Sequence, residues 1–440
     1  MDEITLDVYV EDTRVGVLAS TPEGLFVFTY LPETAPEHLV SLTMPVRAES
    51  YKWNRGGVPH FFRMNLPEGT KKDLIRQQLG GVAQVTDIGL LALTGRRTIG
   101  RVRCLPQGQS LEVAEDNLQV ATLLSSPDAR GLLLAHLEAG VIEGVSGVMP
   151  KLLREDKTTT ATDEYIVKTG RSDVPSMAIN ELLCLLAASR AGLDMHGATL
   201  SDDGTVLAIK RFDRAAGKPT LAVEDFCSLE GLDPEEKYHG SLEGLAARLR
   251  DYVPPERYID NAMRLFKLLL LNCAVRNADA HLKNYALIYT SFDDVELAPV
   301  YDVLTVTVYD RWANDIPALT LEGKKVWACG KSLQRFAAQR LGLSPQQRTV
   351  ALESVETALQ ATFPDIKQYA EKYPYFRETA KRMLNEWETG LAGIQPTATA
   401  KQPPPGAVRE SLGMSEVEPE RKPVANPYVN QDGAFSHKAR

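Results

Sequence analysis

The sequence predicts an α+β protein with two lobes, and two patterns indicate this fold class. Near the start, Ile4–Val10 and Leu25–Tyr30 alternate between apolar and polar residues, as half-buried strands do. Between about residues 111 and 394, strand patterns come first and helical patterns then predominate. A strand-rich lobe followed by a helical lobe leaves a cleft between them, where a ligand can bind.

These patterns divide the chain into four segments. The first is a small α+β subdomain that becomes helical from Pro67 to Gly80, and the polar linker Pro106–Ser110 follows it. The last segment has three consecutive prolines and almost no apolar periodicity, so it cannot bury enough surface to offset its ordering entropy, and we expect disorder there. The expected segments are 1–105, 111–255, 256–394 and 395–440.

Composition is that of an intracellular enzyme. With 440 residues and 44% hydrophobic content, the chain can bury more than one core. It shows neither a secretion leader nor a membrane-spanning run, so we expect a cytoplasmic protein. Five scattered cysteines indicate reduced thiols and neither a disulfide framework nor a zinc site. The net charge of −9 argues against strong nucleic-acid binding by the chain itself.

The most informative residues are Asp279, Asn284 and Asp302. Phosphoryl transfer needs a carboxylate to orient or deprotonate the attacking hydroxyl, and oxygen ligands for magnesium. In protein kinases the catalytic Asp precedes a metal-binding Asn by five positions, and a second metal-binding Asp follows, which is the order found here. We expect Tyr285–Tyr289 and Val295–Ala298 to form a hairpin that returns Asp302 to the side of Asn284.

A plain alternative is a polar turn after a helix, because an isolated match to this spacing is common. The preceding segment, Ile259–Cys273, has apolar residues at helical spacing, which predicts a buried helix. Six polar residues directly after a core helix favour a functional site.

Two upstream features would complete a nucleotide site. Gly144–Lys151 is a short loop containing glycines, whose backbone amides could approach phosphates, although an ordinary hairpin turn has the same appearance. Glu164–Lys168 is an apolar strand that ends in a lysine, and this lysine could either reach the phosphates or be a solvated edge charge. The order of loop, lysine strand, helix and acidic residues favours the nucleotide interpretation.

Eight segments in this order resemble HipA-type serine/threonine kinases, the toxins of bacterial toxin–antitoxin pairs. The resemblance extends over about residues 3–390. The segments are Val8–Gly16, Phe61–Gly69, Ser146–Lys151, Tyr165–Lys168, Lys210–Arg214, Glu224–Cys227, Asn277–Asn284 and Pro299–Asp302. The implied fold is the bilobal, protein-kinase-like fold of that family, with an N-terminal α+β subdomain and a largely helical C-terminal lobe.

The resemblance also implies roles for individual residues. Asp279 would accept the proton, and Asn284 and Asp302 would hold magnesium. The residues implied to bind ATP are Ser146, Gly147, Val148, Met149, Pro150, Lys151, Lys168, Lys210, Arg211, Phe212, His281, Leu282, Lys283, Asn284, Tyr301 and Asp302. The Lys210–Phe212 backbone would meet the adenine.

Two departures from the family pattern concern regulation and the hinge. Some members autophosphorylate a serine aligned with Gly144, and Ser146 is the nearest candidate here. A phosphate on Ser146 would add almost two negative charges beside the ATP phosphates, so we expect it to expel the loop and inactivate the kinase. Lys210 stands where several members have Glu, which is tolerable if backbone groups hold the nucleotide.

The resemblance further implies biological context. The implied function is phosphorylation of a translation component, such as glutamyl-tRNA synthetase or another aminoacyl-tRNA synthetase, which arrests growth. A small HipB-like helix-turn-helix antitoxin would be the partner, and any DNA contact would be made through it. The alternative is a weakly catalytic interaction protein that acts as a co-repressor with its antitoxin. A small-molecule kinase is a weaker third possibility.

Several polar residues have more than one interpretation. Glu181, on the helix after Pro175, could pair with Lys168, but we expect it to face solvent. Glu224–Asp225 could shape a substrate site or cap the following turn. We expect Tyr238–Gly240 to be a loop, and His136 and His196 to be ordinary histidines.

Overall fold

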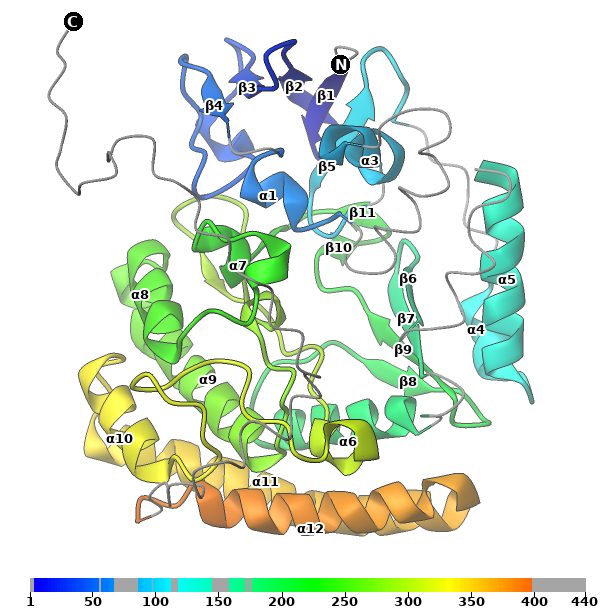
Figure 1. The fold of residues 1–440 in the computed structure, drawn as a ribbon, viewed down its shortest axis with the longest axis vertical. Coiled ribbons are helices and arrows are strands. Elements are labelled where there is room, and N and C mark those ends of the chain that lie inside the picture. The colour runs from blue at the N-terminus through cyan, green and yellow to red at the C-terminus, as the bar shows by residue number, and fades with distance from the viewer. Residues whose placement is uncertain are drawn as a thin grey trace, which may run out of the picture. The chain divides into compact units, whose positions relative to one another are not determined.

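The computed structural model describes residues 4–54, 57–66, 86–96, 98–111, 118–144, 158–170, 174 and 176–397. The predicted helix at 67–80, the loop residues 145–151 and residues 398–440 of the predicted tail lie outside this range. Figure 1 shows the arrangement of the described elements. The fold combines helices with antiparallel sheets and is therefore α+β, as predicted.

The N-terminal part is built on a five-stranded antiparallel sheet. Its strand order is β4-β3-β2-β1-β5, and β1 and β2 form an antiparallel hairpin. The buried residues of these strands pack on two short helices and form their own core around Phe28 and Phe62. The elements are β1 (Thr5–Val10), β2 (Thr13–Ser20), β3 (Phe26–Tyr30), β4 (Tyr51–Trp53), β5 (Val102–Pro106), α1 (His60–Arg63) and α3 (Asp87–Thr94).

A second sheet carries the predicted lysine strand. Its order is β6-β7-β9-β8, with antiparallel neighbours throughout. Two helices precede it, so the expectation that this region starts mostly with strands is wrong in part. Leu123 and Leu133 of these helices form a small core with Val167 and Val206 of the sheet. The elements are α4 (Val120–Leu124), α5 (Ala129–Gly144), β6 (Thr158–Ala161), β7 (Tyr165–Thr169), β8 (Ala198–Leu200) and β9 (Val206–Lys210).

A third sheet, β12-β13-β14, positions the acidic residues. The pairing of β13 with β14 confirms the hairpin predicted between Asn284 and Asp302. The elements of this part are β10 (Arg214–Ala215), β11 (Lys218–Pro219), β12 (Ala222–Asp225), α7 (Phe226–Leu229), β13 (Ala286–Tyr289) and β14 (Glu296–Leu297).

The helical lobe has the largest core of the described residues. The predicted helix before the polar cluster is present as α9, and Phe266, Leu269 and Leu270 are buried. Ile259 is 41% exposed, because the first turns of α9 reach beyond the core. The helices are α6 (Met177–Arg190), α8 (Leu242–Tyr252), α9 (Pro255–Ala274), α10 (Gly330–Gln339), α11 (Pro345–Lys372) and α12 (Arg377–Gly393). The short 3-10 helices are Pro36–His38, Pro234–Glu236, Leu282–Asn284, Val306–Val308, Asp310–Trp312 and Pro374–Phe376.

Glu224 connects the N-terminal part to the third sheet. This fully buried carboxylate accepts hydrogen bonds from the Ser41 hydroxyl (2.7 Å) and from the Leu42 amide (2.9 Å). It also accepts from Ser228 (3.3 Å) and Tyr289 (3.1 Å). Of the two roles left open for the Glu224–Asp225 pair, capping applies to Asp225, which accepts from the Ser228 amide at the start of α7.

All five cysteines are free thiols, as expected. Within the described part of the chain, no helix has both the length and the apolar character needed to cross a bilayer.

Candidate functional site

A cavity of about 280 Å³ lies where β7, β9 and the loop after β14 meet residues of the N-terminal part. It is lined by seven of the residues predicted to bind a nucleotide: Lys168, Lys210, Arg211, Phe212, Lys283, Tyr301 and Asp302. Ile166, Ile209, Val223 and Val300 supply apolar walls. A mostly apolar pocket with a few converging charged groups is the usual form of a small-molecule site.

The Lys168 ammonium holds two carboxylates together at this cavity. Its Nζ donates to Glu181 Oε1 at 2.5 Å and to Asp302 Oδ1 at 3.0 Å. The expectation that Glu181 faces solvent is wrong, since the residue is 2% exposed. α6 is covered by other elements along most of its length, including β7, β9 and α11, so Glu181 has no path to water and pairs with the nearby lysine.

Asp302 has an unusual backbone conformation. Its φ is 58°, in the left-handed region that non-glycine residues seldom adopt. Aspartate tolerates this region better than most residues, and such conformations are concentrated at functional sites. The carboxylate lies at the wall of the cavity, and its side chain is 28% exposed.

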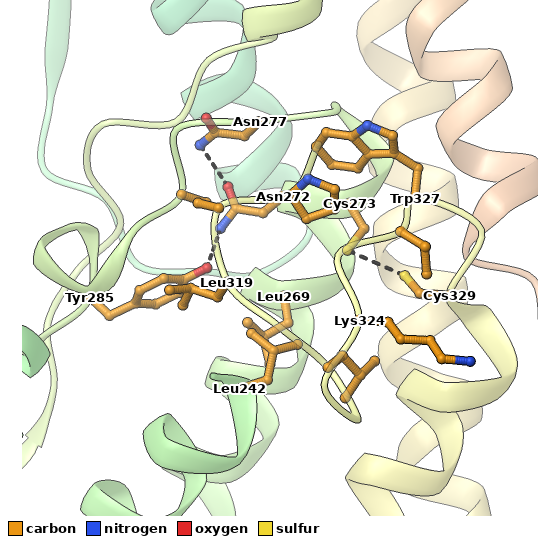
Figure 2. A pocket seen from close by; sticks show the side chains of 15 residues that line it. Leu242, Leu269, Asn272, Cys273, Asn277, Tyr285, Leu319, Lys324, Trp327 and Cys329 are labelled. Carbon is orange, nitrogen blue, oxygen red and sulfur yellow. Dashed lines mark hydrogen bonds between the residues drawn. The ribbon is translucent and has the colours of Figure 1, made fainter. Parts of the chain in front are cut away.

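The Asn277 side chain links the two acidic segments, which are the polar loop of residues 277–284 and the segment Pro299–Asp302. Its Oδ1 accepts from the Asp279 amide (3.2 Å), and its Nδ2 donates to the Asp302 carbonyl (3.4 Å). Asn277 Nδ2 also donates to Asn272 on α9, which in turn donates to the Tyr285 hydroxyl (Figure 2). This buried amide chain fixes the polar loop to the end of α9 and to the start of the hairpin.

Figure 2 also shows the small pocket beside this network, with a volume of about 40 Å³. The Cys273 and Cys329 sulfurs are 3.6 Å apart there, and both residues line the pocket. The hydrogen bond with Cys329, and then burial, raise the pKa of the Cys273 thiol well above its usual value.

Asn284 is oriented by the loop that it closes. Its Nδ2 donates to the Asp279 carbonyl at 2.7 Å, which turns its Oδ1 away from that carbonyl. The polar loop and the hairpin thus bring Asp279, Asn284 and Asp302 into one hydrogen-bonded unit through Asn277. These contacts involve main-chain atoms of Asp279 and Asp302, and Asn284 is not among the residues that line the cavity, so the convergence of the three side chains on one metal ion stays a prediction.

Asp279 lies outside the lining of the cavity, on a more open side of the loop. Its side chain is 42% exposed. The Tyr238 hydroxyl donates to Asp279 Oδ1 at 2.6 Å, and His281 Nε2 is 3.9 Å from the same oxygen. A substrate hydroxyl can therefore approach this carboxylate from solvent.

Within the predicted run His281–Asn284, Lys283 lines the cavity. Its Nζ donates to the Met64 carbonyl (2.8 Å), and its own carbonyl accepts from the Tyr301 hydroxyl (2.9 Å). Burial, and then the charges of Asp225 and Asp302, raise the pKa of Tyr301 well above its usual value, so its phenol stays neutral. The Leu282 side chain is fully buried in the hydrophobic core and is not placed to contact a ligand in the cavity.

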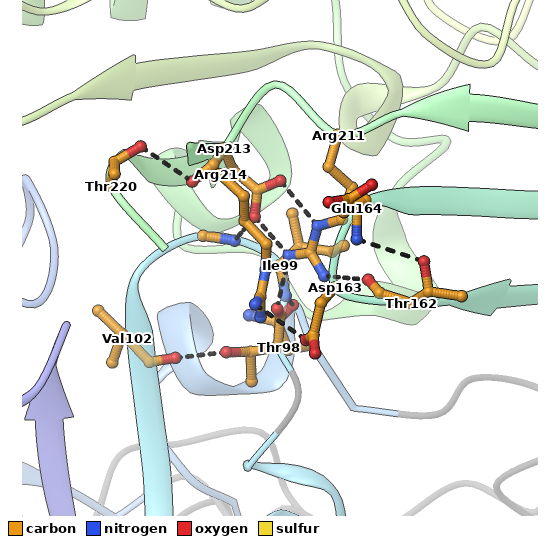
Figure 3. Close-up of polar contacts among 12 residues, drawn as sticks. Thr98, Ile99, Val102, Thr162, Asp163, Glu164, Arg211, Asp213, Arg214 and Thr220 are labelled. Carbon is orange, nitrogen blue, oxygen red and sulfur yellow. Dashed lines mark hydrogen bonds and ion pairs between the residues drawn. The ribbon is translucent and has the colours of Figure 1, made fainter. Parts of the chain in front are cut away.

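The segment after β9 is held by a buried ion pair, drawn in Figure 3. Arg211 Nε donates to Asp213 Oδ1 at 2.9 Å, and the guanidinium also donates to the Thr98 carbonyl at 2.9 Å. Asp213 Oδ2 accepts from the Gly100 amide at 2.7 Å. The Arg211 side chain thus anchors the N-terminal part to this segment.

The sequence interpretation missed several residues of the site. His196 lines the cavity and contacts the Phe212 ring edge-on, with ring centroids 5.9 Å apart. Burial, and then the charge of Lys210, lower the pKa of His196, so its ring is neutral near pH 7. Tyr238 was expected only as part of a loop. Both depend on tertiary contacts and have no local sequence signal.

Met64, Asn65 and Ile99 of the N-terminal part also line the cavity. The Ile99 amide donates to Asn65 Oδ1 at 3.2 Å, which joins two of these residues. The predicted ATP loop residues Ser146–Lys151 lie outside the described residues, so their placement stays a prediction.

Comparison with known proteins gives two family matches. The HipA N-terminal domain matches residues 6–105, and the HipA-like C-terminal domain matches residues 144–363.

Individual relatives are distant. The chain is 26% identical over 370 residues to a putative kinase, Y4dM, of Sinorhizobium fredii, and the alignment covers 78% of this chain and 88% of that protein. It is 22% identical over 349 residues to the serine/threonine-protein kinase toxin HipA of Shewanella oneidensis, with 71% and 78% of the two chains covered.

A solved structure of proteins from Shewanella oneidensis has the same fold as this chain. It is the complex of the Shewanella oneidensis proteins HipA and HipB with operator DNA. A chain of that complex matches with a TM-score of 0.62 at 18% identity, and the match covers 88% of this chain and 96% of that chain.

Proposed function

Because this chain belongs to the HipA family, we propose that it is an ATP-dependent kinase that phosphorylates serine or threonine hydroxyls of a protein. The observation that carries the proposal is the position of Lys168. Its ammonium joins Glu181 and Asp302 at the wall of a 280 Å³ cavity, and Asn277 ties Asp302 to the loop of Asp279. A lysine paired with a helix carboxylate, and an aspartate beside it, are the parts that kinases use to place phosphates.

The nucleotide would occupy this cavity with its base at the segment after β9. The amides of Lys210 and Arg211 donate to the carbonyls of Gly197 and Glu164. The Phe212 amide has no such bond among the described residues, and it is therefore the donor that would meet adenine. The Phe212 ring and the partly buried Tyr301 ring, with centroids 6.1 Å apart, would form an apolar wall.

The residues present suit magnesium. Asp302 and Asn284 offer a carboxylate and an amide oxygen, which are ligands that this ion accepts. When bound, magnesium would neutralise developing negative charge on the phosphates.

Asp279 would act on the acceptor. The acceptor hydroxyl oxygen forms a bond to the terminal phosphorus of ATP, the bond from that phosphorus to the bridging oxygen breaks, and the hydroxyl proton passes to the Asp279 carboxylate. Because this carboxylate is 42% exposed and lies outside the cavity, a side chain on a protein surface can reach it. This openness favours a protein acceptor over an enclosed small molecule.

We propose a HipB-like helix-turn-helix antitoxin as the partner. The support is the fold shared with a protein whose solved complex contains HipB and operator DNA. The net charge of −9 fits a chain whose DNA contacts are made through that partner. The proposed substrate is a translation component, with an aminoacyl-tRNA synthetase such as glutamyl-tRNA synthetase as the first to assay.

The test uses purified protein with ATP, magnesium and a bacterial lysate, followed by mass spectrometry of phosphorylated peptides. We expect new phosphoserine or phosphothreonine sites that are lost with Asp279→Asn. The matched control is Asp293→Asn, which changes an exposed aspartate in the turn between β13 and β14. Growth arrest on expression should follow the same pattern.

The rival function is a co-repressor without catalysis. If the unsubstituted protein transfers no phosphate, and Asp279→Asn leaves operator repression with the antitoxin unchanged, the rival is correct. Autophosphorylation at Ser146 would be detected in the same experiment as a phosphopeptide from residues 141–160.

A further inference from the structure

We infer that Tyr238 is a positioning residue that holds the Asp279 carboxylate in one orientation for the acceptor hydroxyl. The inference rests on the proposed function and deepens it. The Tyr238 hydroxyl donates to Asp279 Oδ1 at 2.6 Å, a distance typical of strong bonds from a hydroxyl to a carboxylate. Tyr238 is far from Asp279 in sequence and is 39% exposed, so the contact is made across the open side of the site.

The phenol has a second partner in the same loop as Asp279. The rings of Tyr238 and His281 meet edge to face, with centroids 5.0 Å apart and planes at 84°. His281 follows Asp279 by two residues and is itself 6% exposed. The Tyr238 ring therefore packs against the buried His281 side chain, and its hydroxyl is hydrogen-bonded to Asp279.

The backbone around Tyr238 is fixed from two directions. On one side, the Leu282 amide donates to the Lys237 carbonyl at 3.1 Å. Gly240 lies so close to Leu282 that an added Cβ would be 2.5 Å from Leu282 Cδ2. The 237–240 loop is thus seated directly on the polar loop.

On the other side, the Lys325 ammonium donates to the Tyr238 carbonyl at 3.1 Å, and the Thr320 amide donates to the Gly240 carbonyl at 3.2 Å. These contacts fix the main chain that carries the phenol and so favour a support over a gate that moves with its loop. A gate formed by movement of the 237–240 main chain would have to break several of them, whereas rotation of the Tyr238 side chain would break only its hydrogen bond to Asp279 and its ring contact with His281.

The consequence concerns the two carboxylate oxygens. With Oδ1 held by the phenol, rotation of the Asp279 side chain is restricted, and Oδ2 is the oxygen left for the acceptor proton. Transfer of a proton during attack requires this oxygen within hydrogen-bond reach of the hydroxyl. A small misplacement of a catalytic group can cost about 100-fold in rate.

The experiment compares the full chain with Tyr238→Phe, which keeps the ring and removes the hydroxyl. We expect kcat for protein phosphorylation to fall about 10- to 100-fold. The KM for ATP should stay within about twofold, because the phenol lies outside the nucleotide cavity. Tyr258→Phe is the matched control, since that phenol bonds Arg250 on the helical lobe and should leave both constants unchanged.

Lys325→Met is the second variant, because it loosens the Tyr238 backbone without touching the phenol. We expect a smaller fall in kcat, again at constant KM for ATP. If the unsubstituted chain is active and Tyr238→Phe, with normal ATP affinity, keeps full kcat, the inference is overturned and the proposed function stands. A rise in kcat would identify a gate and would also overturn it. If the unsubstituted chain transfers no phosphate, both proposals fail.

Discussion

The buried carboxylate of Glu224 should make the stability of this protein depend on pH. Burial, its largest influence, raises the pKa of Glu224 to about 7 from an ordinary 4.5, despite the hydrogen bonds from Ser41, Leu42 and Tyr289 that favour the charged form. The folded protein therefore retains this proton up to about pH 7, whereas the unfolded chain releases it near pH 4.5. Between these values the folded state binds more protons, so rising pH favours unfolding.

The size of the effect follows from the width of this window. One pKa unit corresponds to about 1.4 kcal/mol, so the window of roughly 2.5 units between pH 4.5 and 7 corresponds to ~3 kcal/mol. This stabilisation is fully present below pH 4.5 and is lost as pH rises through 7. A Glu224→Gln variant stays neutral at every pH and should lack this component.

The amide introduced by Glu224→Gln can use the same partners as the natural carboxyl group. Its oxygen can accept from the Leu42 amide and the Tyr289 hydroxyl, and its nitrogen can donate to the hydroxyls of Ser41 and Ser228, which rotate. The variant should therefore fold.

The assay is thermal unfolding of both proteins at about pH 5, 6, 7 and 8. We expect the melting temperature of the natural protein to fall relative to that of the variant by on the order of 5 °C across this range. Glu353→Gln, at an exposed position on α11, is the control and should follow the natural protein. Parallel pH profiles for the natural protein and Glu224→Gln would refute the reasoning.

Three further variants test other parts of the structure. Glu181→Gln removes the charge that holds Lys168, and steady-state kinetics should show kcat/KM for ATP reduced at least about 10-fold. Asn277→Ala breaks the link between the two acidic segments, which should cost about 1–3 kcal/mol in chemical unfolding and lower kcat. Gly390→Ala would place a Cβ 2.0 Å from the Ala274 carbonyl oxygen, so α12 must shift, and calorimetry should show a loss of about 1–3 kcal/mol or more. If any of these measurements were unchanged, the contribution assigned to the corresponding contact would be wrong.

The sequence predicted those parts of the site that depend on local patterns. The spacing of Asp279 and Asn284, and the strands on either side of the turn at 291–294, are local features, and the hairpin is present as β13 and β14. The lysine strand is likewise present as β7, with Lys168 at the cavity. In each case neighbouring residues decide the structure.

Other features depend on which elements pack together, and the sequence could not supply this information. Glu181 resembles any surface carboxylate on a helix until β7, β9 and α11 are seen to cover that helix. Tyr238 meets Asp279 across 41 positions of sequence, and Glu224 meets Ser41 across 183. No periodicity or spacing rule connects residues so far apart.

The N-terminal contribution to the cavity has a thermodynamic consequence. Met64, Asn65 and Ile99 line the same cavity as Lys168 and Phe212, so a molecule that fills it contacts both portions of the chain at once. Ligand binding then strengthens the attachment of the N-terminal portion, and that attachment strengthens ligand binding by the same factor. Any protein that detaches this portion would therefore weaken ligand binding without contacting the residues on the other side of the cavity.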